Sequence, residues 1–176
     1  MTGTVRLTVS QALVRYLAAL QAEVMQPDGR TAVQPYCAGV FAIFGHGNVA
    51  GLGEALHAER ERLPTLRAHS EQGMAHAAVA FAKAHFRQRM MAVTSSIGPG
   101  ATNLVTPAAL ALAARLPLLL LPGDIFASRL PDPVLQQVES FEQGDLSAND
   151  CLRPVTRYFD RIMQPEQLLV ALPRAI

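Results

Sequence analysis

Glu71 is the residue of this chain that is best placed to do acid–base chemistry. It follows Ser70, a residue type that caps helices, and precedes a stretch over residues 73–82 made almost entirely of small and apolar residues. A carboxylate in the first turn of a helix gains a few tenths of a kcal/mol from the helix dipole, so a purely structural role is the simpler interpretation. Gly73, however, costs about 1 kcal/mol of helix stability relative to alanine. The pattern therefore favours a functional carboxylate at the start of a helix against which another surface packs closely.

A glycine-rich loop, Gly45-His46-Gly47-Asn48, separates an apolar run from a helical segment. Such a loop lies at the carboxyl end of a parallel sheet, where α/β proteins bind ligands. His46 is thus a candidate for substrate contact or proton transfer, although a purely structural hydrogen bond fits it equally well. With Gly51 the loop also approximates a dinucleotide fingerprint, so a Rossmann-type nucleotide-binding domain is an alternative. The glycine spacing is irregular, and no acidic residue ends a second strand about 20 residues later.

A second loop, Thr94-Ser95-Ser96-Ile97-Gly98-Pro99-Gly100-Ala101-Thr102-Asn103, joins a strand-like segment to a helical one. The N-terminus of that helix can in principle bind an anion. The loop is not a Walker motif, because no Gly-Lys-Ser/Thr follows the glycines. We expect no metal site in this chain, because no metal-binding spacing connects its five histidines, His46, His57, His69, His76 and His85.

The elements that must position these loops alternate along the chain. Short apolar runs predict buried strands at residues 39–44, 90–94 and 118–121, with one more possible strand at 156–163. The intervening pattern predicts helices over residues 49–62, 70–85 and 102–114 and a final helix from Pro165. This order predicts an α/β fold, a mainly parallel sheet with helices on both faces.

Three further segments complete the expected order. Thr8-Val9-Ser10-Gln11 is a capping box that starts an N-terminal helix. Pro27-Asp28-Gly29 marks a turn within a polar loop. Residues 123–150 form a long connection with weak helical character.

Length and composition limit the class of protein. A chain of 176 residues, half of them hydrophobic, fits one domain with a substantial core. The net charge of +1, the absence of tryptophan and the low aromatic content give no basis for a nucleic-acid partner. The most apolar stretch, residues 104–121, contains two prolines and an arginine, so we expect no membrane span and a cytoplasmic protein. The helical pattern that runs uncapped to Ile176 suggests a piece of a longer protein.

Glu71 with its alanine-rich helix, followed by the run from Thr94 to Asn103, resembles the pyrimidine-binding (PYR) domain of thiamine-diphosphate enzymes such as acetolactate synthase. The resemblance implies that residues 1–176 are a single N-terminal PYR domain with the thiamine-diphosphate-binding fold. It implies that Glu71 activates thiamine diphosphate by hydrogen bonding to the ring nitrogen of the aminopyrimidine. It also implies that the two glycine loops shape the cofactor pocket through Gly45, His46, Gly47, Asn48, Gly98, Pro99, Gly100 and Asn103.

In this family the diphosphate is held through Mg²⁺ by a Gly-Asp-Gly motif with a later asparagine. Gly123-Asp124-Ile125 and Gly144-Asp145-Leu146 lack the last glycine. The resemblance therefore implies that the central and diphosphate-binding domains lie outside this chain, and that the chain alone is inactive. The expected partners are the diphosphate-binding domain of the same or a neighbouring subunit and further copies in a homodimer or homotetramer, with no nucleic acid and no membrane.

A longer resemblance connects the chain with one branch of this family, the trihydroxycyclohexanedione hydrolases of myo-inositol catabolism. It covers nearly the whole chain and is based on residues 39–51, 121–126, 129, 131–137, 143–145 and 149–150. It implies an enzyme that opens a cyclic diketone to a deoxyglucuronic acid, with His46, Arg129 and Asp145 as candidate substrate contacts. Arg129 and Asp145 also fit solvated loop positions. Ser70 stands where asparagine is expected and Pro107 where glycine is expected, which leaves a related substrate open. An acetolactate synthase-like carboligase or decarboxylase is the alternative.

Overall fold

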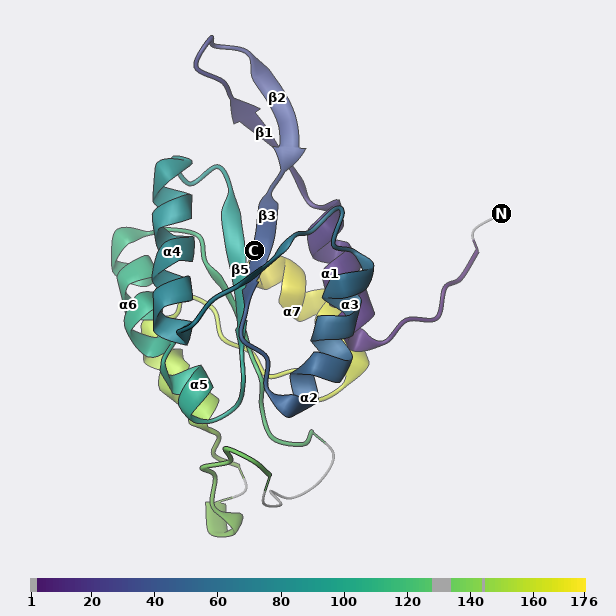
Figure 1. Ribbon diagram of the computed structural model, residues 1–176, viewed down its shortest axis with the longest axis vertical. Coiled ribbons are helices and arrows are strands. Elements are labelled where there is room, and N and C mark those ends of the chain that lie inside the picture. The colour runs from purple at the N-terminus through teal and green to yellow at the C-terminus, as the bar shows by residue number, and fades with distance from the viewer. Residues whose placement is uncertain (1–2, 128–133, 144) are drawn as a thin grey trace.

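The computed structural model describes residues 3–127, 134–143 and 145–176, and it has a parallel sheet of four strands with helices around it (Figure 1). The strand order is β4 (Thr65–Arg67), β3 (Cys37–Ala42), β5 (Met90–Ser95) and β6 (Leu119–Pro122). All six residues of β5 are buried, as expected for a strand that is covered on both faces. The predicted α/β fold is confirmed.

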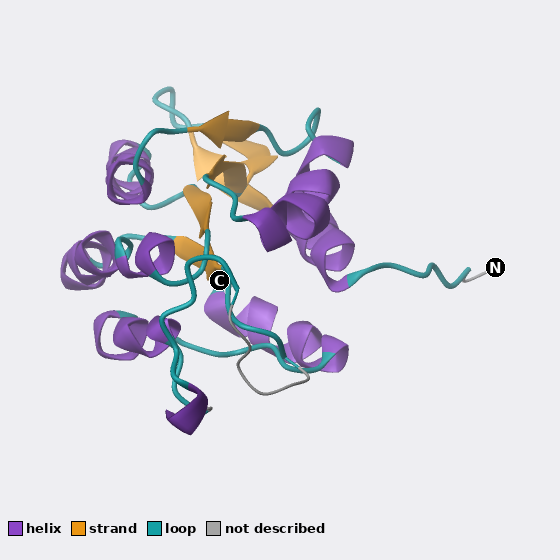
Figure 2. Cartoon of the chain, turned by 60° about the horizontal axis from the view of Figure 1, so that its bottom comes forward, coloured by secondary structure: helices purple, strands orange, loops and turns teal. Residues whose placement is uncertain are grey.

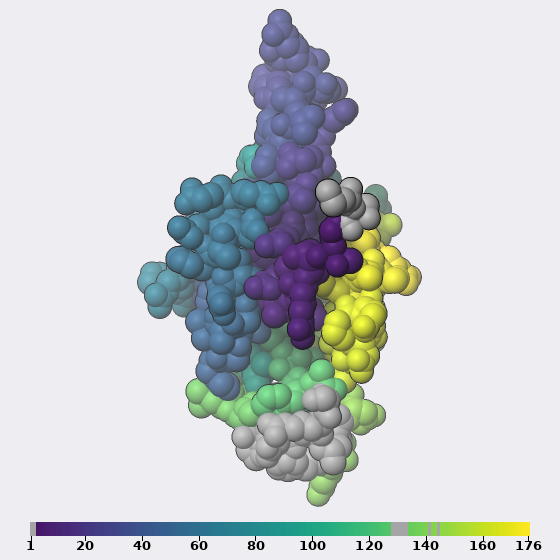
Figure 3. Space-filling view, turned by 90° about the vertical axis from the view of Figure 1, so that its right-hand side faces the viewer, coloured from purple at the N-terminus to yellow at the C-terminus, as the bar shows by residue number. Residues whose placement is uncertain are grey.

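Alternate side chains of β5 enter two separate cores. Met90 and Ala92 pack under α1 (Val9–Ala19), α3 (Glu54–Ala58) and α7 (Leu168–Ala175). Met91 and Val93 pack under α4 (Glu71–Ala84) and α6 (Val105–Ala114). Figure 2 shows helices on both sides of the strands, and Figure 3 shows α1 lying between α3 and α7. The two-residue period of the strand thus builds a three-layer fold.

The predicted capping box at the start of α1 is present. The Thr8 hydroxyl accepts a hydrogen bond from the Gln11 amide at 3.2 Å, and the Gln11 side chain accepts one from the Thr8 amide at 3.0 Å. The helix buries Val14, Leu17 and Ala18 against the sheet. The two reciprocal bonds satisfy amides that would otherwise lack partners at the helix start.

The turn predicted at residues 27–29 is confirmed, but the prediction of a polar loop around it is wrong. The turn joins β1 (Gln21–Met25) and β2 (Thr31–Pro35) in an antiparallel hairpin. The hairpin projects from the amino end of the sheet (Figure 1). The Gln26 amide donates to the Arg30 carbonyl at 2.7 Å, and Gly29 takes a positive φ of 81° in the turn. Exposed and half-buried residues alternate along both strands and none is fully buried, so neither strand has the apolar run of a core strand.

Two predicted helices are broken or shortened. The helix after β3 is divided into α2 (His46–Asn48), a π-helical turn η1 (Val49–Gly53) and α3, which ends at Ala58 and not near residue 62. Glycines at 47, 51 and 53 lower its helical stability. The helix after β5 is divided into α5 (Pro99–Thr102) and α6. Pro107 lies in the first turn of α6, where its missing N–H leaves no intrahelical bond unmade.

The predicted strand at residues 156–163 is wrong. The segment is extended but belongs to no sheet, and side-chain contacts hold it in place. Arg161 pairs with Asp124 at 3.0 Å and with Asp150 at 3.2 Å. Conversely, β4 was not foreseen, because its three residues are all exposed.

The later connection has the weak helical character predicted for it. It contains the 3₁₀ turns η2 (Phe141–Gln143) and η3 (Ala148–Val155), and a further turn, η4 (Pro165–Gln167), leads into α7. Among the described residues, no helix is both long and apolar enough to cross a bilayer.

Candidate active site

Three connections that carry the predicted site residues leave the same edge of the sheet. Residues 45–48 follow β3, Glu71 opens α4 after β4, and residues 96–103 follow β5. These strands are mutually parallel, so all three connections lie at carboxyl ends. Figure 1 shows α2 and α5 at the end of the molecule opposite the hairpin. This is the edge where open α/β sheets bind ligands.

Glu71 is the first residue of α4 and is half-buried. Ser70 caps the helix: its backbone is extended, and its hydroxyl accepts a hydrogen bond from the Gly73 amide at 3.2 Å. The Glu71 Oε2 atom accepts a hydrogen bond from the Asn103 Nδ2 atom at 3.2 Å. The Oε1 atom lies 3.3 Å from the position that a Cβ on Gly100 would occupy. The structure therefore brings three of the predicted residues, Glu71, Gly100 and Asn103, into one place.

Two glycines of the second loop are required by the geometry around them. Gly98 has φ 59° and ψ −121°, and a Cβ there would collide with the carbonyl oxygen of Gln136. A Cβ on Gly100 would collide with the Ser96 hydroxyl. Pro99 opens α5 directly after Gly98. Both glycines are thus required by packing within the chain, and Gly100 lies beside the Glu71 carboxylate.

The first glycine loop packs against the end of β5. A Cβ on Gly45 would lie 2.9 Å from the Ser96 Cβ. The Asn48 side-chain amide donates to the Ser95 carbonyl at 3.2 Å, and it lies 3.1 Å from the Cβ position of Gly123. Asn48 thus joins the connections that follow β3, β5 and β6. His46 and Gly47 are exposed beside it.

A cavity of about 300 Å³ opens beside this loop. His46, Asn48, Asp124 and Gln136 give it polar groups. Glu71 does not line the cavity. Its Oε1 atom and the hydroxyl of Ser96, which does line the cavity, both lie near the position that a Cβ on Gly100 would occupy. The full lining consists of Gly45, His46, Gly47, Asn48, Ser96, Ile97, Asp124, Ile125, Phe126, Ala127, Val134 and Gln136.

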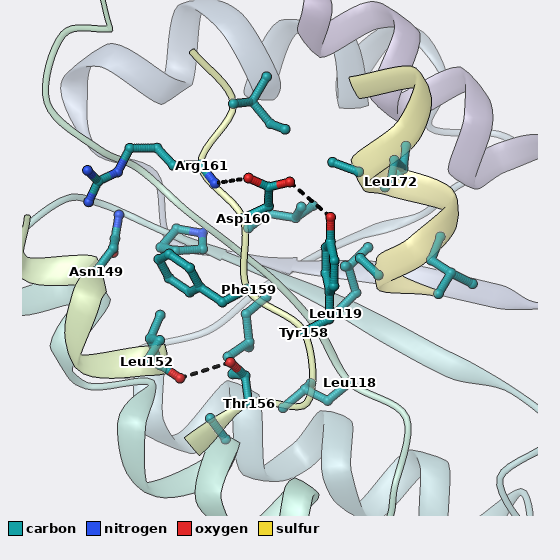
Figure 4. Close-up of a pocket in the computed structure, with 18 of the residues that line it drawn as sticks. Leu118, Leu119, Asn149, Leu152, Thr156, Tyr158, Phe159, Asp160, Arg161 and Leu172 are labelled. Atoms are coloured by element: carbon teal, nitrogen blue, oxygen red, sulfur yellow. Dashed lines mark hydrogen bonds between the residues drawn. The ribbon is translucent and has the colours of Figure 1, made fainter. Parts of the chain in front are cut away.

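A larger cavity of about 1060 Å³ lies beside the edge strand β6, between residues 156–162 and α7 (Figure 4). Many of its charged groups are already paired within the chain. Tyr158 donates to Asp160 at 2.9 Å, and the Arg161 backbone amide donates to Asp160 at 2.8 Å. Neither Glu71 nor the second glycine loop lines it. We therefore assign the ligand site to the carboxyl edge and not to this larger space.

The same segment contains a charge cluster around Asp150. Burial by itself raises the pKa of the Asp150 carboxyl group, but the Ser147 amide, Arg153 and Arg161 outweigh burial and lower the pKa below its ordinary value. Arg153 Nε lies 2.7 Å from Asp150 Oδ1. The carboxylate therefore ties the connection after β6 to the extended segment at residue 161.

The predicted substrate residues have different positions. His46 lines the smaller cavity. Asp145 is exposed and lines neither cavity, and Arg129 lies outside the described residues. Within the described ranges, no three His, Cys, Asp or Glu side chains gather as a metal site.

Sequence reasoning missed three residues of the site. Ser96 is buried at the contact between the two loops, and it was noted only as part of a motif. Asp124 and Gln136 line the smaller cavity from the connection after β6. Gln136 has a positive φ of 70°, which no local pattern predicts for glutamine.

Comparison with known proteins identifies relatives of the chain. Residues 36–146 match the family described as "Thiamine pyrophosphate enzyme, N-terminal TPP binding domain". The chain is 51% identical over 175 residues to a 3D-(3,5/4)-trihydroxycyclohexane-1,2-dione hydrolase of Shouchella clausii, covering 99% of this chain and 27% of the relative. It is 50% identical over 174 residues to the enzyme of that name from Geobacillus thermodenitrificans, covering 99% of this chain and 26% of the relative. The chain thus spans about a quarter of the length of these curated relatives.

The family match includes both glycine loops and Glu71. It decides against the nucleotide-binding alternative, for which the irregular Gly45 loop was the only support. The chain therefore belongs to the thiamine pyrophosphate enzyme family, as represented by its N-terminal TPP-binding domain.

Proposed function

We propose that this chain is the cofactor-activating PYR domain of a thiamine-diphosphate-dependent hydrolase that opens trihydroxycyclohexanedione to a deoxyglucuronic acid. The observation that carries the proposal is the Glu71 carboxylate, held at the carboxyl edge of the sheet with Oε2 bonded to Asn103 and Oε1 next to Gly100. About 50% identity over nearly the whole chain to enzymes of that name supports the reaction. The activity belongs to the full-length protein, because the chain spans only a quarter of such a relative.

The residues at this edge suit the aminopyrimidine of the cofactor. Gly100 lies beside the Glu71 carboxylate, and Gly98 lets the backbone of the same loop pack against Gln136. The two glycines thus fix the course of the loop next to the proposed acid. When bound, thiamine diphosphate supplies a nucleophilic carbon and an electron sink for carbonyl chemistry. Glu71 holds or shares a proton with the ring nitrogen, while the two glycine loops hold the ring in place.

The diphosphate and its Mg²⁺ are assigned to a diphosphate-binding domain outside residues 1–176, in the same or a neighbouring subunit. The full-length protein is proposed to be a cytoplasmic homodimer or homotetramer. The exposed residues of α4, among them Gly73, Ala77 and Ala80, suit close contact with such a domain, because their side chains are small.

The smaller cavity suits a polyhydroxylated ring. His46, Asn48 and Gln136 give it groups that donate and accept hydrogen bonds, while the Asp124 carboxylate beside them is already bonded to Ser147 and Arg161. Among the candidate substrate residues, His46 has the support of this position, and it is the one that we propose contacts the substrate. Asp145 has no such support, and Arg129 lies outside the described residues.

The full-length enzyme can be tested with two substrates in the presence of thiamine diphosphate and Mg²⁺. We expect ring opening of trihydroxycyclohexanedione, observed by NMR of the product, and loss of this activity when the cofactor is removed. Pyruvate should give no acetolactate. Acetolactate formation without ring opening would replace the proposal with the carboligase alternative.

A further inference from the structure

We infer that Asn103 is a positioning residue for Glu71. The Asn103 side chain holds one oxygen of the Glu71 carboxylate and leaves the other oxygen to the ligand. The inference rests on the proposed function of Glu71, and it adds a role that is distinct from contact with the cofactor. Asn103 reaches Glu71 from a different connection of the sheet, 32 residues along the chain. Within the described residues, this is the only hydrogen bond of the Glu71 carboxylate.

Both partners are attached to fixed backbone. The backbone amide of Asn103 donates to the Pro99 carbonyl at 3.2 Å at the end of α5. The next residue, Leu104, is fully buried. Ser70 and its bond to the Gly73 amide fix the start of α4 at Glu71. The hydrogen bond between the two side chains therefore connects two anchored helix ends and selects one rotamer of the carboxylate.

The other carboxylate oxygen has different surroundings. Oε1 has no hydrogen-bond partner in the described part of the chain, and it lies beside Gly100, which has no side chain. The Ser96 hydroxyl occupies the space where a Gly100 side chain would extend. One oxygen accepts a hydrogen bond from the protein and the other accepts none within the described residues, so the two oxygens of Glu71 are not equivalent.

This asymmetry determines where a proton resides. The Asn103 Nδ2 group only donates, so the oxygen that it contacts must accept. In a neutral carboxyl group the carbonyl oxygen is the better acceptor, and the hydrogen is then on the opposite oxygen. Asn103 consequently directs the Glu71 proton to Oε1. A plain structural bridge between the ends of α4 and α5 would not require the proton to lie on Oε1.

NMR of the ¹⁵N-labelled 176-residue chain tests the contact without the cofactor. The side-chain amide signals of Asn103 should shift during a pH titration as the Glu71 carboxyl group gains its proton. The shift should disappear in Glu71→Gln and persist in Thr106→Ala, an exposed residue one turn later. An Asn103 amide that responds identically with and without the Glu71 carboxylate would overturn the inference.

A double-mutant cycle in the full-length enzyme tests the consequence. The rate of hydrogen–deuterium exchange at the reactive carbon of bound thiamine diphosphate should fall about tenfold in Asn103→Ala, with the substrate KM nearly unchanged. In the Glu71→Gln background the same substitution should change that rate less than about twofold. Equal fold-changes in the two backgrounds would show that Asn103 acts independently of Glu71. Parental turnover of Glu71→Gln would instead contradict the proposed function, and the NMR titration would still test the contact.

Discussion

Gly98 and Gln136 approach so closely that a Cβ on the glycine would collide with the carbonyl oxygen of the glutamine. Both residues have positive φ angles, of 59° and 70°. The connection after β6 is thereby seated on the loop after β5, and the two together close one side of the smaller cavity. The shape of the proposed site thus depends on the close approach of these two residues.

Gly98→Ala should destabilise the chain by about 1–3 kcal/mol, because alanine is strained at this φ and ψ and its methyl group meets the Gln136 carbonyl. Urea denaturation followed by circular dichroism measures the loss. Gly47→Ala is the matched control, because a Cβ there meets nothing within 4 Å. We expect the control to change stability by less than about 1 kcal/mol. Equal stability of the two variants would show that residues 98 and 136 do not constrain one another.

The positions of the site's backbone could be predicted better than its contacts. The loop at 45–48, the loop at 98–100 and the start of α4 all follow from the change between apolar runs and helical pattern, which is local information. The approach of Asn103 to Glu71 joins residues from two connections and depends on how the helices pack. Gln136 was not foreseen as a wall of the cavity for the same reason, and its left-handed backbone has no local sequence signal.

The misassigned elements show the limit of periodicity. The β1–β2 hairpin alternates between exposed and half-buried residues, and none of its strand residues is fully buried, so it lacks the apolar run that marks a core strand. Residues 156–163 have strand-like composition, but Arg161 pairs with two aspartates and the segment remains outside the sheet. In both cases contacts distant in sequence outweigh local pattern.

The Asp150 cluster makes a prediction about pH. The folded-state pKa of Asp150 is lowered, so its stabilising contribution is present above the unfolded value of about 3.9 and is lost as the pH falls through the lower folded value. At pH 7, the free energy of unfolding of Asp150→Asn should be about 1–3 kcal/mol lower than that of the parent. At about pH 3, the difference in the free energy of unfolding between Asp150→Asn and the parent should be smaller.

Denaturant titrations at the two pH values measure this change. Glu142→Gln, which alters an exposed carboxylate, serves as the control and should show no comparable effect. A destabilisation by Asp150→Asn that is equally large at both pH values would contradict the role of the charge.

Calorimetry tests where the cofactor's main anchor lies. If the diphosphate and Mg²⁺ are held outside residues 1–176, this chain alone has only the aminopyrimidine contacts, which are too few for tight binding. Titration with thiamine diphosphate and Mg²⁺ should therefore give little or no heat with the chain and a saturable signal with the full-length protein. Micromolar binding by the chain alone would place the anchor within it.

Turnover of the full-length Glu71→Gln variant tests the central claim most directly. The amide keeps the size of the side chain and removes the acid, so catalysis with trihydroxycyclohexanedione should fall by roughly two orders of magnitude or more. Glu54→Gln is the matched control, an exposed carboxylate in the first turn of α3, and it should retain parental turnover. Turnover of Glu71→Gln within a few-fold of the parent would show that Glu71 is only a carboxylate at the start of a helix.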